Sequence, residues 1–233
     1  MGNSTSEGEP RLENIGSTAQ VVGNSVTEEN NPLLAIHGWY GSNGKIYPSE
    51  EAAQEAARVL LLYLGEAIDR EGLVDTPKRM LKALREMTEG YQDDPKTILQ
   101  RRFSLFHDEL TLLTRIPFVS LCEHHLLPFS GVASVGYVPA NNQIVGLSKL
   151  ARLVACFARR LQIQEQLTGQ IADSLVEHLQ PLGAACIIQA EHSCLACRGA
   201  RVSGTRFVTS ALRGCLKEDV RARAELMSLI GTG

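Results

Sequence analysis

Two short runs of Cys and His constrain this chain more than any other feature of its sequence. The first is Cys122-Glu123-His124-His125, and the second is His192-Ser193-Cys194-Leu195-Ala196-Cys197. The chain has six Cys and six His, and these runs hold three of each. No Cys precedes residue 122, whereas a disulfide framework would spread its Cys through many loops. Mixed Cys/His runs are typical of a metal site in a reducing compartment.

The spacing of these residues predicts a zinc site. Cys122 and His125 are three apart, and Cys194 follows much later, which is a usual arrangement of zinc ligands. Thiolate and imidazole suit Zn²⁺ better than Mg²⁺ or Ca²⁺. Three protein ligands leave a fourth position for water, as in catalytic sites, whereas a fourth ligand from Cys197 would close a structural site. The ligand pattern leaves both possibilities open.

The two remaining His of the runs favour catalysis. His124 and His192 are not needed as ligands, and His is the side chain best matched to proton transfer near neutral pH. A single such His is more often a packing residue, but two beside metal-ligating Cys indicate a hydrolytic site.

Cations and one acid complete the candidate site. Lys and Arg near a helix N-terminus can bind a polyanion such as a triphosphate, although most single surface cations are merely solvated. Ser148 is predicted to cap a helix, and the candidate cations are Lys149, Arg152, Arg198, Arg79 and Lys82. Glu165 begins another predicted helix, and its carboxylate either stabilises that helix or accepts hydrogen bonds from a guanine.

Composition excludes several classes of protein. Of 233 residues, 44% are apolar and 21% are charged, which excludes collagen, coiled coil and complete disorder. The net charge of −3 gives no basic surface for nucleic acid or an anionic membrane, so neither is expected as a partner. Residues 1–30 show no export signal, and no apolar stretch is long enough for a membrane span, so we expect a cytoplasmic protein.

The hydrophobic pattern predicts an α+β protein behind a disordered arm, residues 1–46. Helices are expected to begin at Ser49 and at Thr76, and two more to follow Ser148 and Gln164. Extended segments are predicted at 112–121, 131–139, 184–191 and 206–212. Pro117 in the first of these indicates an edge or a bulge. The order predicts two long helices against one face of a largely antiparallel sheet.

Four ordered motifs resemble the GTP cyclohydrolase I family. They are the Cys122–His125 run, Gly146–Arg152, Arg160–Thr168, and Glu191–Gly199. Gly72–Arg79 is similar to the entry into the family's N-terminal helix, and the resemblance covers about residues 50 to 229.

The resemblance implies a fold and an assembly. It implies the tunnelling fold, in which a four-stranded antiparallel sheet carries two antiparallel helices on one face. The domain would be 47–233, with an N-terminal helical part at 47–110 and the core at 111–233. Family members form toroidal homo-oligomers of ten subunits, two stacked pentamers, with active sites at subunit interfaces.

The resemblance also implies a reaction and residue roles. The reaction is zinc-dependent hydrolysis and ring rearrangement of GTP to 7,8-dihydroneopterin triphosphate and formate, the first step towards folate or tetrahydrobiopterin-type pterins. Zn²⁺ would be held by Cys122, His125 and Cys194, while His124 and His192 would move protons. Gln164 and Glu165 would bind guanine, and the triphosphate would be held by Lys149, Arg152, Arg198, Arg79 and Lys82, with Ser148 nearby.

Two alternatives remain at this level. Cys197 stands where relatives often carry an apolar residue, so the chain could be a catalytically silent binding protein with a closed structural zinc site. The other alternative is a different purine or pterin enzyme on the same fold, such as a nitrile reductase of deazaguanine synthesis, which lacks this pair of metal motifs.

Overall fold

The computed structural model describes residues 38–40 and 46–231, so most of the predicted arm, 1–46, lies outside the described residues. The chain forms two compact units that divide between Pro77 and Lys78. In the first unit, β1 (Gly38–Tyr40) pairs antiparallel with β2 (Ile46–Pro48). Helix α2 (Glu50–Tyr63) follows, and the predicted cap is confirmed, because the Ser49 hydroxyl accepts from the Ala52 amide at 3.2 Å.

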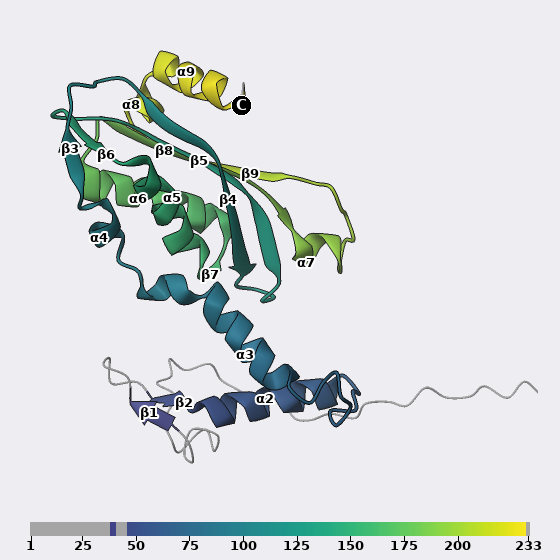
Figure 1. The fold of residues 1–233 in the computed structure, drawn as a ribbon. Helices are drawn as coiled ribbons and strands as arrows, with labels where there is room; N and C mark the ends of the chain where they lie inside the picture. The colour runs from purple at the N-terminus through teal and green to yellow at the C-terminus, as the bar shows by residue number, and fades with distance from the viewer. Residues whose placement is uncertain (1–37, 41–45, 232–233) are drawn as a thin grey trace, which may run out of the picture. The chain divides into compact units, whose positions relative to one another are not determined.

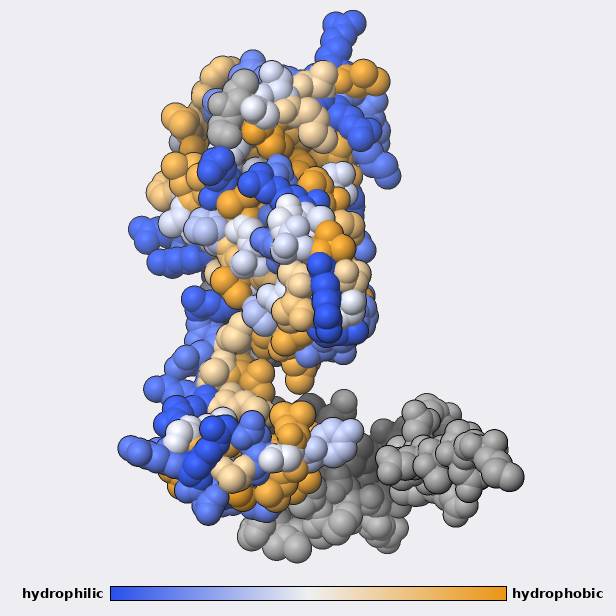
Figure 2. All heavy atoms as spheres, turned by 90° about the vertical axis from the view of Figure 1, so that its right-hand side faces the viewer, coloured by the Kyte–Doolittle hydropathy of each residue, from blue (hydrophilic) through white to orange (hydrophobic). Residues whose placement is uncertain are grey.

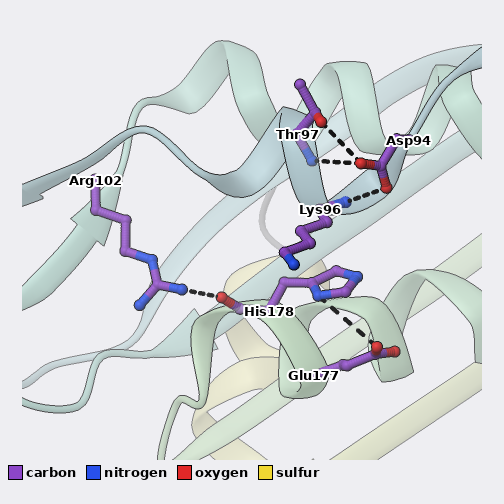
Figure 3. Close-up of polar contacts among 6 residues, drawn as sticks. All are labelled: Asp94, Lys96, Thr97, Arg102, Glu177 and His178. Carbon is purple, nitrogen blue, oxygen red and sulfur yellow. Dashed lines mark hydrogen bonds and ion pairs between the residues drawn. The ribbon is translucent and has the colours of Figure 1, made fainter.

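Short elements precede the sheet of the second unit. They are α3 (Thr76–Met87), which begins at the unit boundary, the 3₁₀ helix η2 (Glu89–Gln92), α4 (Pro95–Leu99) and β3 (Arg102–Ser104). The Asp94 carboxylate caps α4 by accepting from the Lys96 and Thr97 amides. The hydrogen bond from the Thr97 hydroxyl, and after it those from the two amides, lower the Asp94 pKa. Figure 3 shows this cap beside the Arg102 guanidinium, which donates to the His178 carbonyl oxygen.

The core of the second unit is a five-stranded sheet in the order β7-β4-β5-β8-β9 (Figure 1). Its four long strands are antiparallel neighbours: β4 (Thr111–Cys122), β5 (Pro128–Val138), β8 (Gly183–His192) and β9 (Phe207–Gly214). The α+β class and the four predicted strands are therefore confirmed. The two-residue strand β7 (Leu161–Gln162) was not predicted, and it adds parallel to the end of β4.

Pro117 has the role that the sequence predicts. It pairs with Val132 of β5, while β7 reaches β4 only at Leu121 and Cys122, so the other side of β4 at Pro117 is an edge. A bulge interrupts the same strand just before it, between Leu113 and Ile116, where Arg115 has φ of 56°.

Two helices cover one face of the sheet. Helix α5 (Leu147–Ala158) packs on β4, and α6 (Gln164–Leu179) packs on β8 and β9. Their apolar faces meet alternate residues of β8, such as Cys186 and Ile188, in the main core. The predicted cap of α5 is wrong: Gly146 is the N-cap, and Ser148 lies one residue inside the helix, where its hydroxyl cannot cap.

The opposite face of the sheet has a smaller core that the sequence did not predict. The other residues of β8, Ala185 and Ile187, pack there with Leu212, Leu216 and Leu226. Leu216 lies in α8 (Cys215–Glu218), and Leu226 lies in α9 (Val220–Gly231). The sheet is thus covered on both faces around Ala185 and Ile187, because α8 and α9 pack on the face opposite α5 and α6.

A short strand pair lies beside the sheet. β3 pairs antiparallel with β6 (Gln143–Val145), and the side-chain amide of Gln143 donates to the Ser104 hydroxyl at 3.0 Å. On the face drawn in Figure 2, hydrophobic and hydrophilic residues are intermixed over this unit. Within the described ranges, no helix is both long enough and apolar enough to cross a membrane.

The closest approach between β5 and β8 gives a stability prediction. A Cβ at Gly131 would lie 1.9 Å from the Gln189 carbonyl oxygen. We therefore expect Gly131→Ala to lower the free energy of unfolding by about 2 kcal/mol or more, because backbone atoms must move. Gly169 of α6 is the matched control, since nothing lies within 4 Å of its added Cβ, and Gly169→Ala should raise stability by roughly 0.5–1 kcal/mol. Urea unfolding measures both, and equal effects would contradict the close approach.

Candidate active site

A pocket at one end of the sheet collects the predicted metal and proton-transfer residues. It has a volume of about 310 Å³ and lies where β4 and β8 end and α6 begins. The described residues that line it are Cys122, His124, His125, Gln162, Ile163, Gln164, Glu165, His192, Cys194, Leu195 and Phe207. Both Cys/His runs and the beginning of α6 are therefore brought together, although they are far apart in the sequence.

A tight turn after β4 presents the first run. The Leu126 amide donates to the Cys122 carbonyl oxygen at 2.8 Å, and the Cys122 amide donates to that of Leu127 at 2.9 Å. Leu126 has φ of 53°, which lets the chain reverse directly into β5. The Glu123 amide donates to the Gln162 carbonyl oxygen at 3.1 Å, so the turn is also held to the connection between α5 and α6.

The second run lies across the neighbouring strand. His192 ends β8, pairs with Phe129 of β5, and precedes α7 (Ser193–Ala196). Cys194 therefore lies in the first turn of this short helix, next to the end of β4. Cys197 is the residue at which α7 ends, and its side chain is exposed.

Three side chains form a group that can hold a metal ion. The ligand atoms of Cys122, His125 and Cys194 all lie within 4.8 Å of one another, and Cys122 Sγ is 3.7 Å from His125 Nδ1. Cys197 is not a member of this group. The geometry therefore favours three protein ligands with one coordination position left over, as the catalytic alternative requires.

The electrostatics of the two thiols fit a bound cation. Burial raises the pKa of Cys194, and its proximity to Cys122 raises it further, whereas nearby Arg198 lowers it. The Cys194 thiol therefore resists ionisation without a positive charge nearby. A divalent ion that accepts sulfur and nitrogen supplies that charge and deprotonates the thiols as it binds.

This arrangement predicts a pH-dependent metal affinity. A thiol with a raised pKa keeps its proton, so the metal must displace it, and acid opposes binding. The association constant for Zn²⁺ should rise about tenfold per pH unit for each proton released. Calorimetric titration of metal-stripped protein, in buffers of different ionisation enthalpy, measures both the affinity and the protons. A constant affinity from pH 6 to 8 would contradict this role of Cys194.

The two other His lie beside the metal group in different surroundings. His124 is exposed, and its ring meets that of His125 edge to face at 6.2 Å. His192 is half-buried, stacks on Phe129 with ring centroids 4.5 Å apart, and has its Nε2 2.9 Å from Gln164 Oε1. Burial lowers the pKa of His192, while Glu165 opposes that shift, so the neutral ring is favoured at neutral pH.

Comparison with known proteins identifies the family. Residues 53–231 match the family model described as GTP cyclohydrolase I. The chain belongs to the GTP cyclohydrolase I family. It is similar to the GTP cyclohydrolase 1 of Corynebacterium glutamicum (strain ATCC 13032), with 51% identity over 78% of this chain and 93% of the relative. It is equally similar to that of Geobacillus kaustophilus, with 51% identity over 75% of this chain and 93% of the relative.

The predicted triphosphate residues lie outside the pocket of this GTP cyclohydrolase I chain. None of the residues that line it is Ser148, Lys149, Arg152, Arg198, Arg79 or Lys82. Lys149 lies in the first turn of α5, and the pocket is reached only after the last turn, so about 14 Å of helix separates them. Arg198 lies close enough to the metal group to lower the pKa of Cys194.

Apolar residues of the pocket were not predicted from the sequence of this family member. Ile163, Leu195 and Phe207 line it, and the Phe207 ring meets that of His192 edge to face at 5.9 Å. Apolar side chains beside a carboxylate suit a purine ring. Phe207 is the second residue of the predicted segment 206–212 and the first of β9, where it pairs with Ala190 of β8.

Proposed function

We propose that this chain hydrolyses GTP and rearranges its ring to give 7,8-dihydroneopterin triphosphate and formate, the entry step of pterin and folate biosynthesis. One observation supports this above all. In a member of the GTP cyclohydrolase I family, the Cys122, His125 and Cys194 ligand atoms lie within 4.8 Å of one another beside two further His. The three-ligand group and the two further His line one pocket of about 310 Å³.

Zinc is the metal that fits this group best. Two thiolates and one imidazole select Zn²⁺ over oxygen-preferring cations, and Cys122, His125 and Cys194 would hold it. When bound, zinc would supply Lewis acidity and lower the pKa of a water ligand towards neutrality. Hydrolysis at C8 of the purine requires such an activated water.

The remaining side chains of the pocket have distinct roles. His124 and His192 transfer protons: one to the ring nitrogen as the C8–N9 bond opens, and one in the release of formate. The Glu165 carboxylate, exposed and at the N-terminus of α6, accepts from N1–H and the 2-amino group of guanine. The apolar wall of the pocket excludes water from the base.

Triphosphate binding requires residues beyond this pocket. Ser148, Lys149, Arg152, Arg198, Arg79 and Lys82 are proposed to hold the phosphates, some of them from a neighbouring subunit. The distance of Lys149 from the pocket along α5 supports a site shared between copies of the chain. This agrees with the tunnelling fold and a toroidal homodecamer of two stacked pentamers, which we propose for the assembly.

Product analysis tests the proposed function directly. Zinc-loaded protein incubated with GTP should release one formate and form one fluorescent pterin, after oxidation, for each GTP consumed. ATP is the matched control, because adenine offers neither the N1–H nor the 2-amino group that Glu165 would recognise. Absence of formate from GTP in fully zinc-loaded, oligomeric protein would contradict the proposal.

A further inference from the structure

The side-chain amide of Gln164 is fully engaged inside the protein. Gln164 is 1% exposed. Its Nε2 lies 3.2 Å from the Ile188 carbonyl oxygen, 3.0 Å from that of Phe207 and 3.1 Å from Thr209 Oγ1. Its Oε1 lies 2.9 Å from His192 Nε2. The amide therefore has its donors and its acceptor occupied by protein atoms, although Gln164 lines the pocket.

The carbonyl partners fix the orientation of this amide. Main-chain oxygens only accept, so the atom that faces Ile188 and Phe207 must be the nitrogen, and the flipped amide is excluded. Gln164 Oε1 only accepts, so His192 Nε2 must carry the proton between them. The tautomer of His192 thus follows from two backbone carbonyl groups on β8 and β9.

The neighbouring hydroxyl groups agree with this direction. Thr168 Oγ1 donates to the Gln164 carbonyl oxygen at 2.7 Å, which uses its one proton. Thr209 must therefore donate to Thr168 Oγ1, 2.6 Å away, and its lone pairs are left for Gln164 Nε2. Every donor in the network has an acceptor, and Gln164 Nε2 has three acceptors within 3.2 Å for its two protons.

The ring of His192 is held in its plane as well. It stacks on Phe129 with an interplanar angle of 3° and meets Phe207 at 70°. With Nε2 protonated and bound to Gln164, Nδ1 is the unprotonated nitrogen of the neutral ring. Within the part of the chain that the structure describes, no side chain or backbone group is hydrogen-bonded to Nδ1.

We propose that Gln164 is a positioning residue, which holds the His192 ring in place as the Nε2–H tautomer and leaves Nδ1 as the ring nitrogen that has no hydrogen bond to the described part of the protein. This inference rests on the proposed function, and it replaces the expectation that the Gln164 side chain binds guanine. Recognition of the guanine edge at this end of α6 is then left to the Glu165 carboxylate. Such hydrogen bonds from an outer partner commonly set the tautomer and orientation of functional His.

Nitrogen spectroscopy tests the tautomer without any use of activity. Magic-angle-spinning ¹⁵N spectra of the zinc-loaded full chain, labelled in histidine, should show His192 with a protonated Nε2 and an unprotonated Nδ1. The His192→Ala variant identifies the resonances by their loss. In Gln164→Leu the His192 signals should become a mixture of tautomers. A wild-type His192 protonated at Nδ1 would overturn the proposal, whether or not the protein consumes GTP.

Kinetics separate positioning from substrate binding. Gln164→Leu should lower kcat about ten- to a hundredfold and leave KM for GTP within about twofold. In a His192→Ala background the same substitution should cause no further loss, because Gln164 acts through His192. A raised KM with unchanged kcat, or an undiminished loss in that background, would show that Gln164 acts on the substrate itself.

Thr168→Val is the matched control for packing. It removes a buried hydrogen bond to the Gln164 main chain but leaves the contact between Gln164 Oε1 and His192 in place. It should keep the wild-type ¹⁵N pattern and a kcat within about twofold of wild type. If Thr168→Val lowers kcat as much as Gln164→Leu does, local packing and not the tautomer explains the loss.

Discussion

Replacing Cys122 by serine is expected to lower the rate of formate release from GTP by about a thousandfold or more, since a catalytic metal supplies several kcal/mol of transition-state stabilisation. Cys122 lies at the end of β4, buried, with its Sγ 3.7 Å from His125 Nδ1. A serine hydroxyl keeps the shape of the side chain but is a poor ligand for zinc. Bound metal, measured by plasma mass spectrometry, should fall together with activity.

Cys197→Ser is the matched control for this prediction. Cys197 is also a thiol of the second run, but it is exposed and does not belong to the three-ligand group. Its replacement should leave the zinc content and the rate of formate release within about twofold of wild type. Loss of zinc in Cys197→Ser would instead support the closed, structural site that the sequence left open. The pair of variants therefore decides between the enzyme and the silent binding protein.

Removal of the His192 ring should have the second largest effect. We expect His192→Ala to lower kcat about a hundredfold to ten-thousandfold, which is the usual contribution of a positioned proton-transfer group. Zinc content should be unchanged, because the ligand atoms come from other residues. Single-turnover measurement of formate release, with the metal assayed on the same sample, checks both parts of the prediction.

His178→Ala provides the comparison for His192. His178 lies in the last turn of α6, at the other end of this helix from the pocket residue Gln164. Figure 3 shows its contact with Glu177. Its replacement should change kcat by less than about twofold, as for most substitutions remote from a site. A His192→Ala variant that changed only KM for GTP would show that this ring binds substrate and does not transfer protons.

Most of the fold could be predicted because its elements carry strong local signals. The helix that begins at Ser49 has its cap, and α6 begins at Gln164 as its apolar spacing indicates. The errors come from weak or tertiary signals. Strand β7 has only two residues, and α9 has its apolar residues spread widely around its axis. Gly146 caps α5 although Ser148 is the better capping residue by type.

The metal group could be predicted because its spacing and ligand chemistry are local properties of two motifs. Gln164 shows where this reasoning ends. A glutamine in the first turn of a helix is usually exposed, and nothing in the sequence shows that two carbonyl oxygens from β8 and β9 surround its amide. The cations show the same limit, since Lys149 is close to other motif residues in sequence but a helix length from the pocket.

Arg160 holds the segment that joins α5 to α6. Its guanidinium donates to the main-chain oxygens of Gly90 and Cys156 and lies over the rings of Tyr91 and Phe157. The Tyr91 hydroxyl in turn accepts from the Leu161 amide at 3.2 Å. These contacts hold in place the segment that leads into the pocket wall at Gln162, without help from a ligand. If guanine binds here as we propose, little ordering entropy has to be offset on this side, and the shape of this wall selects among bases.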